Sequence, residues 1–305
     1  MKMTFQKLVI GTSMAIGVSA LATVPAQAGT LTAPTIGGTA ASDYYVYDSD
    51  GKNTFKVENT SANVQKALSG NADSPTGNVE LRASSEGRDF DFTKNTSLTG
   101  TIGGKTLTLS SLTSDDWFGD GKTTTTYGLD NLANNWFNKA LDSSGITTST
   151  FTSLTILGYS KQSLFDSFLK SGGFQRFSDP NISYVNQDDT SGLISIGLAG
   201  HYNAAPLITP FLGLTAQLSK LLPSSLQASE IVKYTYDGKT DYLYSFKASN
   251  SGLVEKGDGI SHSGNYQVNI KGVAPAAVPE PSIILGLLGV AGVFATQRKF
   301  KKASI

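Results

Sequence analysis

The 305-residue sequence contains no cysteine, and this absence excludes three kinds of chemistry. Without thiols the chain has no disulfide bonds, no thiolate metal ligands and no cysteine nucleophile. Charged residues are also scarce, at 16% against roughly 25% in an average soluble domain, and they balance at 24 basic and 24 acidic residues. Because a basic excess is the electrostatic signature of nucleic-acid-binding proteins, we expect no nucleic-acid partner.

Histidine is nearly absent, which restricts catalytic triads and metal sites. His201 and His262 are the only two, and neither has a histidine or a carboxylate beside it at the spacing of metal ligands. No Gly-x-Ser-x-Gly segment presents a serine nucleophile. We therefore interpret both histidines as surface or turn residues, and we expect no metal ion and no cofactor.

Three Gly-Lys-Thr triplets, at Gly104, Gly121 and Gly238, are similar to the end of a phosphate-binding loop. That loop requires another glycine five positions earlier, so that successive backbone N–H groups surround the phosphates. Threonine, aspartate and lysine occupy those positions here. The triplets follow glycine or aspartate as hairpin turns do, and we interpret them as turns.

The amino-terminal segment has the three parts of a secretory signal peptide. Lys2 and Lys7 supply the basic start, residues 8–22 form a short apolar run, and Ala26-Gln27-Ala28 provides a small-x-small cleavage site. We expect residues 1–28 to direct export through the membrane and to be removed by signal peptidase. The mature chain would then begin at Gly29.

The carboxyl-terminal segment has the pattern of a membrane anchor. Residues 282–296 would form a helix of about 22 Å, short for a hydrocarbon core of about 30 Å, and four cations follow them. These cations are Arg298, Lys299, Lys301 and Lys302. Because cationic tails stay in the cytoplasm, the pattern predicts a transmembrane helix and basic tail over residues 282–305, with the body of the chain outside.

The order Pro279-Glu280-Pro281, apolar helix and basic cluster resembles the PEP-CTERM sorting signal of Gram-negative bacteria. That resemblance implies recognition by an exosortase, processing near the Pro-Glu-Pro motif and association with exopolysaccharide or biofilm material. Segments of the body also resemble an uncharacterised PEP-CTERM family found mainly in cyanobacteria, for which no activity is implied. They are residues 98–102, 173–181, 196–201 and 261–266.

The body between these signals shows strand patterns on both sides of a helical middle, which predicts an α+β fold with an antiparallel sheet. Leucine and isoleucine alternate with threonine on both sides of Gly103-Gly104, as in a β-hairpin. Hairpins or strands are predicted at 44–47, 54–57, 79–83, 89–93, 97–102, 105–109, 184–185, 193–198, 231–236, 242–248 and 266–270. Helices are predicted at 129–141, 163–170 and 210–222. We expect one domain over residues 29–271, irregular up to residue 42, and a linker over 272–281.

Chemistry-bearing clusters are few in this body. Asp115-Asp116 and Asp188-Asp189 are the best carboxylate pairs for glycosidic acid–base chemistry, although the plainer interpretation places Ser114 or Asp115 at the N-cap of a helix. The turn at residues 48–51 is acidic but lacks the spacing of a calcium-binding loop. An aromatic cluster is expected to be exposed and able to contact a sugar: Tyr44, Tyr45 and Tyr47.

Two address signals around a body without a catalytic constellation favour one function. The sequence predicts a non-enzymatic, exosortase-sorted protein of the cell surface or of an exopolysaccharide or biofilm matrix, tethered in the membrane before its processing. The alternatives are a secreted hydrolase that acts on envelope polysaccharide through the aspartate pairs and a carbohydrate-binding module that uses the tyrosine cluster.

Overall fold

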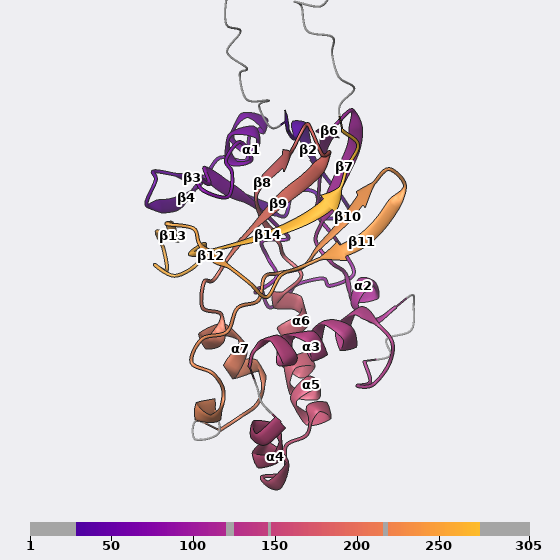
Figure 1. Cartoon of the computed structure of the whole chain (residues 1–305), viewed down its shortest axis with the longest axis vertical. Helices are drawn as coiled ribbons and strands as arrows, with labels where there is room; N and C mark the ends of the chain where they lie inside the picture. Colours follow the sequence, from indigo (N-terminus) through magenta and orange to yellow (C-terminus); the bar gives the residue numbers. More distant parts are fainter. Residues whose placement is uncertain (1–28, 120–124, 146–147, 216–218, 275–305) are drawn as a thin grey trace, which may run out of the picture.

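The computed structural model describes residues 29–119, 125–145, 148–215 and 219–274. Two β-sheets fill one end of the molecule, and most of the helices gather at the other end (Figure 1). The described chain is therefore α+β, with strands before and after a helical middle, as the sequence predicts.

The larger sheet has nine strands and is antiparallel throughout, except that β13 pairs with β4 in parallel. Its order is β12 (Ser249–Asn250), β14 (Gly264–Lys271), β9 (Leu193–Gly200), β8 (Asn181–Gln187), β5 (Gly77–Leu81), β3 (Tyr44–Ser49), β4 (Asn53–Val57) and β13 (Val254–Glu255), with β1 (Gly29–Thr30) on β8. The predicted hairpin around residues 48–51 is confirmed as β3 and β4.

The smaller sheet has five strands, in the order β11 (Lys239–Leu243), β10 (Val232–Tyr236), β7 (Lys105–Ser110), β6 (Ser97–Ile102) and β2 (Thr32–Gly37). The predicted hairpin across Gly103-Gly104 is confirmed. Both glycines have positive φ angles, 57° and 73°, which a residue without Cβ adopts at no steric cost. Asp237-Gly238 is likewise the turn between β10 and β11.

Aliphatic side chains from both sheets form one core, which helix α1 (Ser61–Ala67) also contacts. Leu98 and Ile102 of β6 are buried in it, whereas the alternate residues Ser97, Thr99 and Thr101 are more exposed. This period-two burial is the physical counterpart of the alternating sequence, because successive strand side chains point to opposite faces.

Aromatic side chains dominate the second core, at the helical end. The helices there are α2 (Ser114–Phe118), α3 (Leu132–Ser143), α4 (Thr148–Ile156), α5 (Lys161–Lys170), α6 (Gly173–Arg176), α7 (Ala205–Phe211) and the 3₁₀ turn η1 (Ser219–Leu221). Trp136 of α3 lies at the centre and contacts the rings of Phe168, Phe174 and Phe177. Helices α3 and α5 confirm the two helices predicted from apolar periodicity at 129–141 and 163–170.

Four predictions about local structure are wrong. The strand expected over 242–248 is confirmed only at its start, because β11 ends at Leu243 and residues 244–248 are not in a strand. The helix expected over 210–222 is replaced by α7, which ends just after Pro210, and by η1. Residues 89–93 form turns rather than a strand. The segment up to residue 42 is not irregular, because it supplies β1 and β2. Strand β2 tolerates Pro34 since it is an edge strand with a register shift between Thr32 and Thr35.

Within the described ranges, no helix has both the length and the apolar character needed to cross a membrane. The predicted signal peptide with Ala26 and Ala28, the Pro-Glu-Pro motif and the predicted anchor over 282–305 lie outside these ranges. At the inner limits of the described body, Gly29 pairs with Gln187, and the Gln187 amide donates to the carbonyl of Val273 (Nε2–O 2.7 Å). The two ends of the described body therefore meet at one point.

Candidate functional site

A cavity of about 360 Å³ lies where the sheet region meets the helical region. Strands β3, β5 and β9 contribute to one side of it, and α6, α7 and the loops before β8 and β10 contribute to the other. Six carboxyl groups line this cavity: Glu80, Glu86, Asp179, Glu230, Glu255 and Asp258. These six residues come from separate parts of the chain. We call the cavity the acid pocket, after its carboxyl groups.

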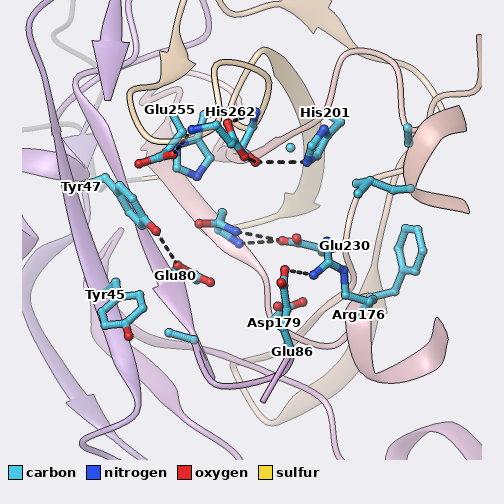
Figure 2. A pocket seen from close by; sticks show the side chains of 18 of the residues that line it. Tyr45, Tyr47, Glu80, Glu86, Arg176, Asp179, His201, Glu230, Glu255 and His262 are labelled. Atoms are coloured by element: carbon cyan, nitrogen blue, oxygen red, sulfur yellow. Dashed lines mark hydrogen bonds and ion pairs between the residues drawn. The ribbon is translucent and has the colours of Figure 1, made fainter. Parts of the chain in front are cut away.

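The sheet side of the acid pocket carries Tyr45, Tyr47 and Glu80 (Figure 2). Adjacent strands β3 and β5 bring them together, with Tyr45 opposite Glu80 in the register. The Tyr47 hydroxyl is buried and donates to Glu80 (Oη–Oε2 3.0 Å), whereas the Tyr45 ring is 41% exposed. The ammonium of Lys56 lies 3.5 Å from the centre of the Tyr45 ring. This side therefore offers a partly exposed aromatic ring, one face of which Lys56 covers, beside a carboxyl group.

Asp179 and Glu230 lie across the acid pocket from Glu80, and the three carboxyl groups point toward its centre (Figure 2). Asn181 holds Glu230 with its backbone N–H and its side-chain amide (3.1 and 3.2 Å to Oε2). The Ser85 hydroxyl donates to Oδ2 of Asp179. Asp179 is only 5% exposed, yet its Oδ1 has no hydrogen-bond partner among the described residues, and neither has the Asn181 side-chain oxygen.

The environment of these three carboxyl groups keeps protons on them. Burial raises the pKa of Glu80 to about 7, against the opposing effect of the Tyr47 hydroxyl. Burial, with the nearby charge of Glu80, raises the pKa of Asp179 to about 8. The pKa of Glu230 is raised well above its ordinary value by burial and by Asp179. At neutral pH the group therefore contains carboxylic acids that both donate and accept hydrogen bonds.

The helical side supplies one cation and an apolar surface. Arg176, the last residue of α6, forms an ion pair with Glu86. Phe177 and Phe211 line the same side of the acid pocket and also belong to the aromatic core or pack against it. The arrangement of aromatic rings in the helical core therefore positions one side of the site.

Both histidines line the acid pocket; His201 is half-buried, and His262 is a buried turn residue rather than a surface one. His262 is 6% exposed, and its Nδ1 lies 2.7 Å from the Thr54 hydroxyl oxygen. Burial lowers its pKa to about 4, so the ring is neutral at physiological pH. The turn interpretation is confirmed for His262, whose φ of 62° is uncommon for a non-glycine residue and is over-represented at functional sites.

A histidine, a serine and an aspartate lie close together in the acid pocket but do not form a catalytic triad. They are His201, Ser261 and Asp258. Nε2 of His201 lies 3.2 Å from the Ser261 hydroxyl, which itself donates to Asp258. In a triad the carboxylate would instead hold the second ring nitrogen of the histidine. Burial acts to raise the pKa of Asp258, but hydrogen bonds from Ile260 and Ser261 outweigh it and the pKa is lowered. Asp258 is therefore an ionised carboxylate in the acid pocket.

The predicted tyrosine cluster is divided by the fold. Tyr45 is exposed and lines the acid pocket, as expected for a ligand contact, and Tyr47 lines the pocket but is buried. Tyr44 does not line the acid pocket. Its hydroxyl instead donates to the carbonyl of Asn59 (3.2 Å). The prediction that all three are exposed is wrong, since a half-buried strand turns alternate side chains to opposite faces.

Asp115 and Asp116 belong to the start of α2 rather than to the acid pocket. Thr113, not Ser114 or Asp115, is the N-cap, and Asp116 completes a capping box with it. Asp116 also accepts from Lys233 (2.7 Å) and from the Tyr242 hydroxyl (2.9 Å). The prediction that this segment begins a helix is thus confirmed, although the N-cap residue differs. The two carboxylates do not line the acid pocket.

The other acidic turns are also structural. Asp188 accepts from the backbone N–H groups of Thr190 and Ser191 in the turn between β8 and β9, and neither Asp188 nor Asp189 lines the acid pocket. Asp50 accepts from Lys52 and Asn53 in the same manner between β3 and β4. Across the described residues, no three His, Asp or Glu side chains are grouped as ligands for a metal ion.

Reasoning from the sequence missed the three central acids because each is isolated in the chain. Glu80 offered the clearest signal, since it lies between Val79 and Leu81 in an otherwise buried strand. Asp179 lies in the segment 173–181 that carried part of the family resemblance. Glu230 offered no local signal beyond its position before an apolar strand.

Comparisons with known proteins add no assignment to this geometry. No protein-family model matches the chain, and neither a curated protein nor a solved structure is similar to it. The interpretation of the acid pocket therefore depends on its own residues.

Proposed function

We propose that this chain is an exported protein of the cell surface or of an exopolysaccharide or biofilm layer, and that its acid pocket binds a saccharide of that layer. Support for export comes from the signal-peptide pattern and from the Pro-Glu-Pro, apolar and basic elements in order at the carboxyl end. The partners on this route are signal peptidase, the export machinery, an exosortase and, through the carboxyl-terminal helix, the membrane.

The observation that carries the binding proposal is the combination of an exposed Tyr45 ring with several protonated carboxyl groups in one cavity. Sugars present apolar ring faces that pack on aromatic side chains, and hydroxyl groups that both donate and accept. Groups such as Asp179 and Glu230 match the hydroxyls, because a carboxylic acid also does both. The volume of about 360 Å³ lies at the lower end of the range for ligand pockets.

Retention of the purified full-length protein on isolated native exopolysaccharide tests this proposal. Tyr45→Ala should reduce retention about tenfold, which is a common loss when an aromatic contact is truncated. Tyr202→Ala is the matched control, because Tyr202 is 42% exposed and does not line the acid pocket. Equal retention of the native protein and of Tyr45→Ala, or no retention of either, would contradict binding at this site.

The sorting part of the proposal has its own experiment. Intact-mass measurement and cell fractionation would follow the native protein beside a Pro279→Ala variant. We expect the native chain to lose its carboxyl-terminal segment and to leave the membrane, and the variant to stay full length and membrane-bound. A full-length, membrane-bound product in both cases would make the segment an ordinary anchor.

A second candidate function is hydrolysis of the same polysaccharide, and one observation favours it. The acid pocket pairs carboxyl groups of raised pKa, Glu80 and Asp179, with the ionised Asp258 from another side. Environments that separate the pKa values of two carboxyl groups suit a general acid and its partner base or nucleophile. These residues replace the aspartate pairs that the sequence suggested for this chemistry.

Release of reducing ends from the polysaccharide would distinguish hydrolysis from binding. If the protein is a hydrolase, reducing ends should accumulate with time, and Asp179→Asn or Asp258→Asn should each abolish the release. If no reducing ends appear between pH 4 and pH 9 while retention persists, the non-enzymatic function stands.

A further inference from the structure

The acid pocket contains features that specify the charge of its ligand. We infer that the group seated among Glu80, Asp179 and Glu230 is a protonated amine, so that the bound saccharide contains amino sugars with free amino groups. This inference depends on the proposed binding function and adds the chemical class of the ligand.

Two buried oxygen atoms of the site have no hydrogen-bond partner among the described residues. They are Oδ1 of Asp179 and Oδ1 of Asn181, which line the cavity. Buried polar groups in native proteins are nearly always hydrogen-bonded, so the Asn181 oxygen, and the Asp179 oxygen once that carboxyl group has lost its proton, call for donors from a ligand. An ammonium group brings three donors and no acceptor, whereas a hydroxyl brings one donor.

The charge around the three acids also favours a cationic ligand. None of the ion pairs formed by the described residues includes Glu80, Asp179 or Glu230. The two cations that line the acid pocket have their direct contacts elsewhere, Arg176 with Glu86 and Lys56 with the Tyr45 ring. Their charges act to lower the pKa of Glu80, and that of Arg176 also acts on Asp179, but burial outweighs them and both pKa values stay raised. A buried carboxylate is strongly unfavourable without a compensating charge. A ligand cation would supply that charge to all three acids together.

The three carboxyl groups are directed toward one region of the acid pocket. Glu80 approaches from β5, while Asp179 and Glu230 approach from loops before β8 and β10, and the three converge on one region (Figure 2). The exposed ring of Tyr45 stands beside this region, where it can contact the sugar that carries the amine. The N-acetylated sugar would present a neutral amide with a carbonyl oxygen toward these acceptors, and would bind more weakly.

Proton release is the signature of this arrangement. Without a ligand, the acids hold protons because burial and their mutual charges raise their pKa values. An ammonium group among them stabilises the carboxylate forms and lowers those pKa values. Binding of the amine at pH 6 should therefore release protons to the buffer, and binding of a neutral sugar should not.

The experiment uses the full-length protein and two probes of equal length, the tetramers of glucosamine and of N-acetylglucosamine. Titration calorimetry at pH 6, in two buffers of different protonation heat, gives the affinity and the protons released. We expect the glucosamine tetramer to bind at least tenfold more tightly and with proton release. Retention on native exopolysaccharide should fall at least tenfold after its amino groups are chemically acetylated.

Variants assign the effect to the acids. Glu230→Gln and Asp179→Asn keep the shape of each side chain, and each should weaken amine binding at least tenfold and reduce the proton release. Asp115→Asn is the control, because Asp115 is exposed and outside the acid pocket. Circular dichroism of each variant checks that it is folded.

The outcomes separate the two proposals. Equal binding of both tetramers without proton release, or undiminished retention after acetylation, would overturn the amine inference and leave saccharide binding intact. Failure of both tetramers to bind, together with no retention on the untreated polysaccharide, would overturn both proposals.

Discussion

The sheet region and the helical region of this protein are stabilised by different kinds of core. Aliphatic side chains fill the space between the two sheets, whereas tryptophan and phenylalanine rings fill the space among the helices. The sheets bring distant strands into fixed register, while helices α2 to α7 are short, from 4 residues in α6 to 12 in α3. The comparison suggests that the sheets fix one side of the acid pocket and that ring packing fixes the other.

The acid pocket inherits a different contribution from each region. The backbone ladder of β3 and β5 places Tyr45, Tyr47 and Glu80. Phe177 and Phe211 reach the pocket from the aromatic core. A site at such a junction responds to a change in either core.

The largest effect is expected from Trp136→Ala in the aromatic core. Trp136 is almost fully buried against several rings, and its truncation should lower the free energy of unfolding by about 3–5 kcal/mol. Urea unfolding followed by tryptophan fluorescence and circular dichroism measures the loss. Ile156→Ala is the control, because Ile156 is 80% exposed and should change stability by less than about 0.5 kcal/mol. Loss of helical signal before loss of sheet signal would show that the two regions unfold separately.

The next effect is the pH dependence of stability at the junction. The folded-state pKa of Asp179, about 8, lies above the ordinary unfolded value near 4, so folding favours its protonated form. Stability should therefore fall as the pH rises from about 5 to 8, and Asp179→Asn should raise stability at pH 8 by about 1–3 kcal/mol. Thermal unfolding of both proteins at several pH values tests this expectation. A native protein that is more stable at pH 8 than at pH 5, with Asp179→Asn unchanged, would contradict it.

A smaller effect is expected at the contact between α2 and β10. Asp116→Asn weakens the capping box with Thr113 and the ion pair with Lys233, and should lower the unfolding free energy by about 1–2 kcal/mol. Saccharide retention should not change, because Asp116 does not line the acid pocket. Parallel urea unfolding and retention measurements would check both statements. If a folded Asp116→Asn variant no longer bound the saccharide, the statement that Asp116 has no role in binding would be contradicted.

The smallest effect on stability is expected at Tyr45. Its ring is largely exposed, so Tyr45→Ala should alter the unfolding free energy by less than about 0.5 kcal/mol while reducing retention. Tyr47→Phe makes the contrast sharper, because it removes the buried hydroxyl that donates to Glu80 and should therefore raise the pKa of Glu80 further. Unfolding curves measured beside the retention assay separate the two roles. A large loss of stability in Tyr45→Ala would show that this ring is structural.

Local patterns predicted much of the fold because local geometry determines them. Alternating Leu98 and Ile102 identified β6, and apolar periodicity identified α3 and α5. The strand β2 was missed because Pro34 argues against a strand unless its position at a sheet edge is known. The helix expected over 210–222 differs from α7 because Pro210 lies within the last turn of α7 and the helix ends at Phe211.

The candidate site could not be predicted because it depends on contacts between residues distant in sequence. Glu80, Asp179 and Glu230 have no common local pattern, and their raised pKa values arise from burial and from one another. The paired acids that the sequence suggested for the site have structural roles instead. Asp116 belongs to a helix capping box, and Asp188 accepts hydrogen bonds within a turn. Adjacent carboxylates in a sequence are therefore weak indicators of a site, whereas a lone acid in a buried strand is a stronger one.

The most direct test of the acid pocket as a ligand site is a carbon-13 NMR titration of its carboxyl groups in the full-length protein. Spectra of the native protein, Glu80→Gln, Asp179→Asn and Glu230→Gln would assign the signals, and the titration would be repeated with the glucosamine tetramer. We expect carboxyl groups that titrate near or above pH 7 in the free protein and at lower pH with the tetramer bound. Titration of all three near pH 4, unchanged by the tetramer, would contradict both the buried acid cluster and its proposed ligand.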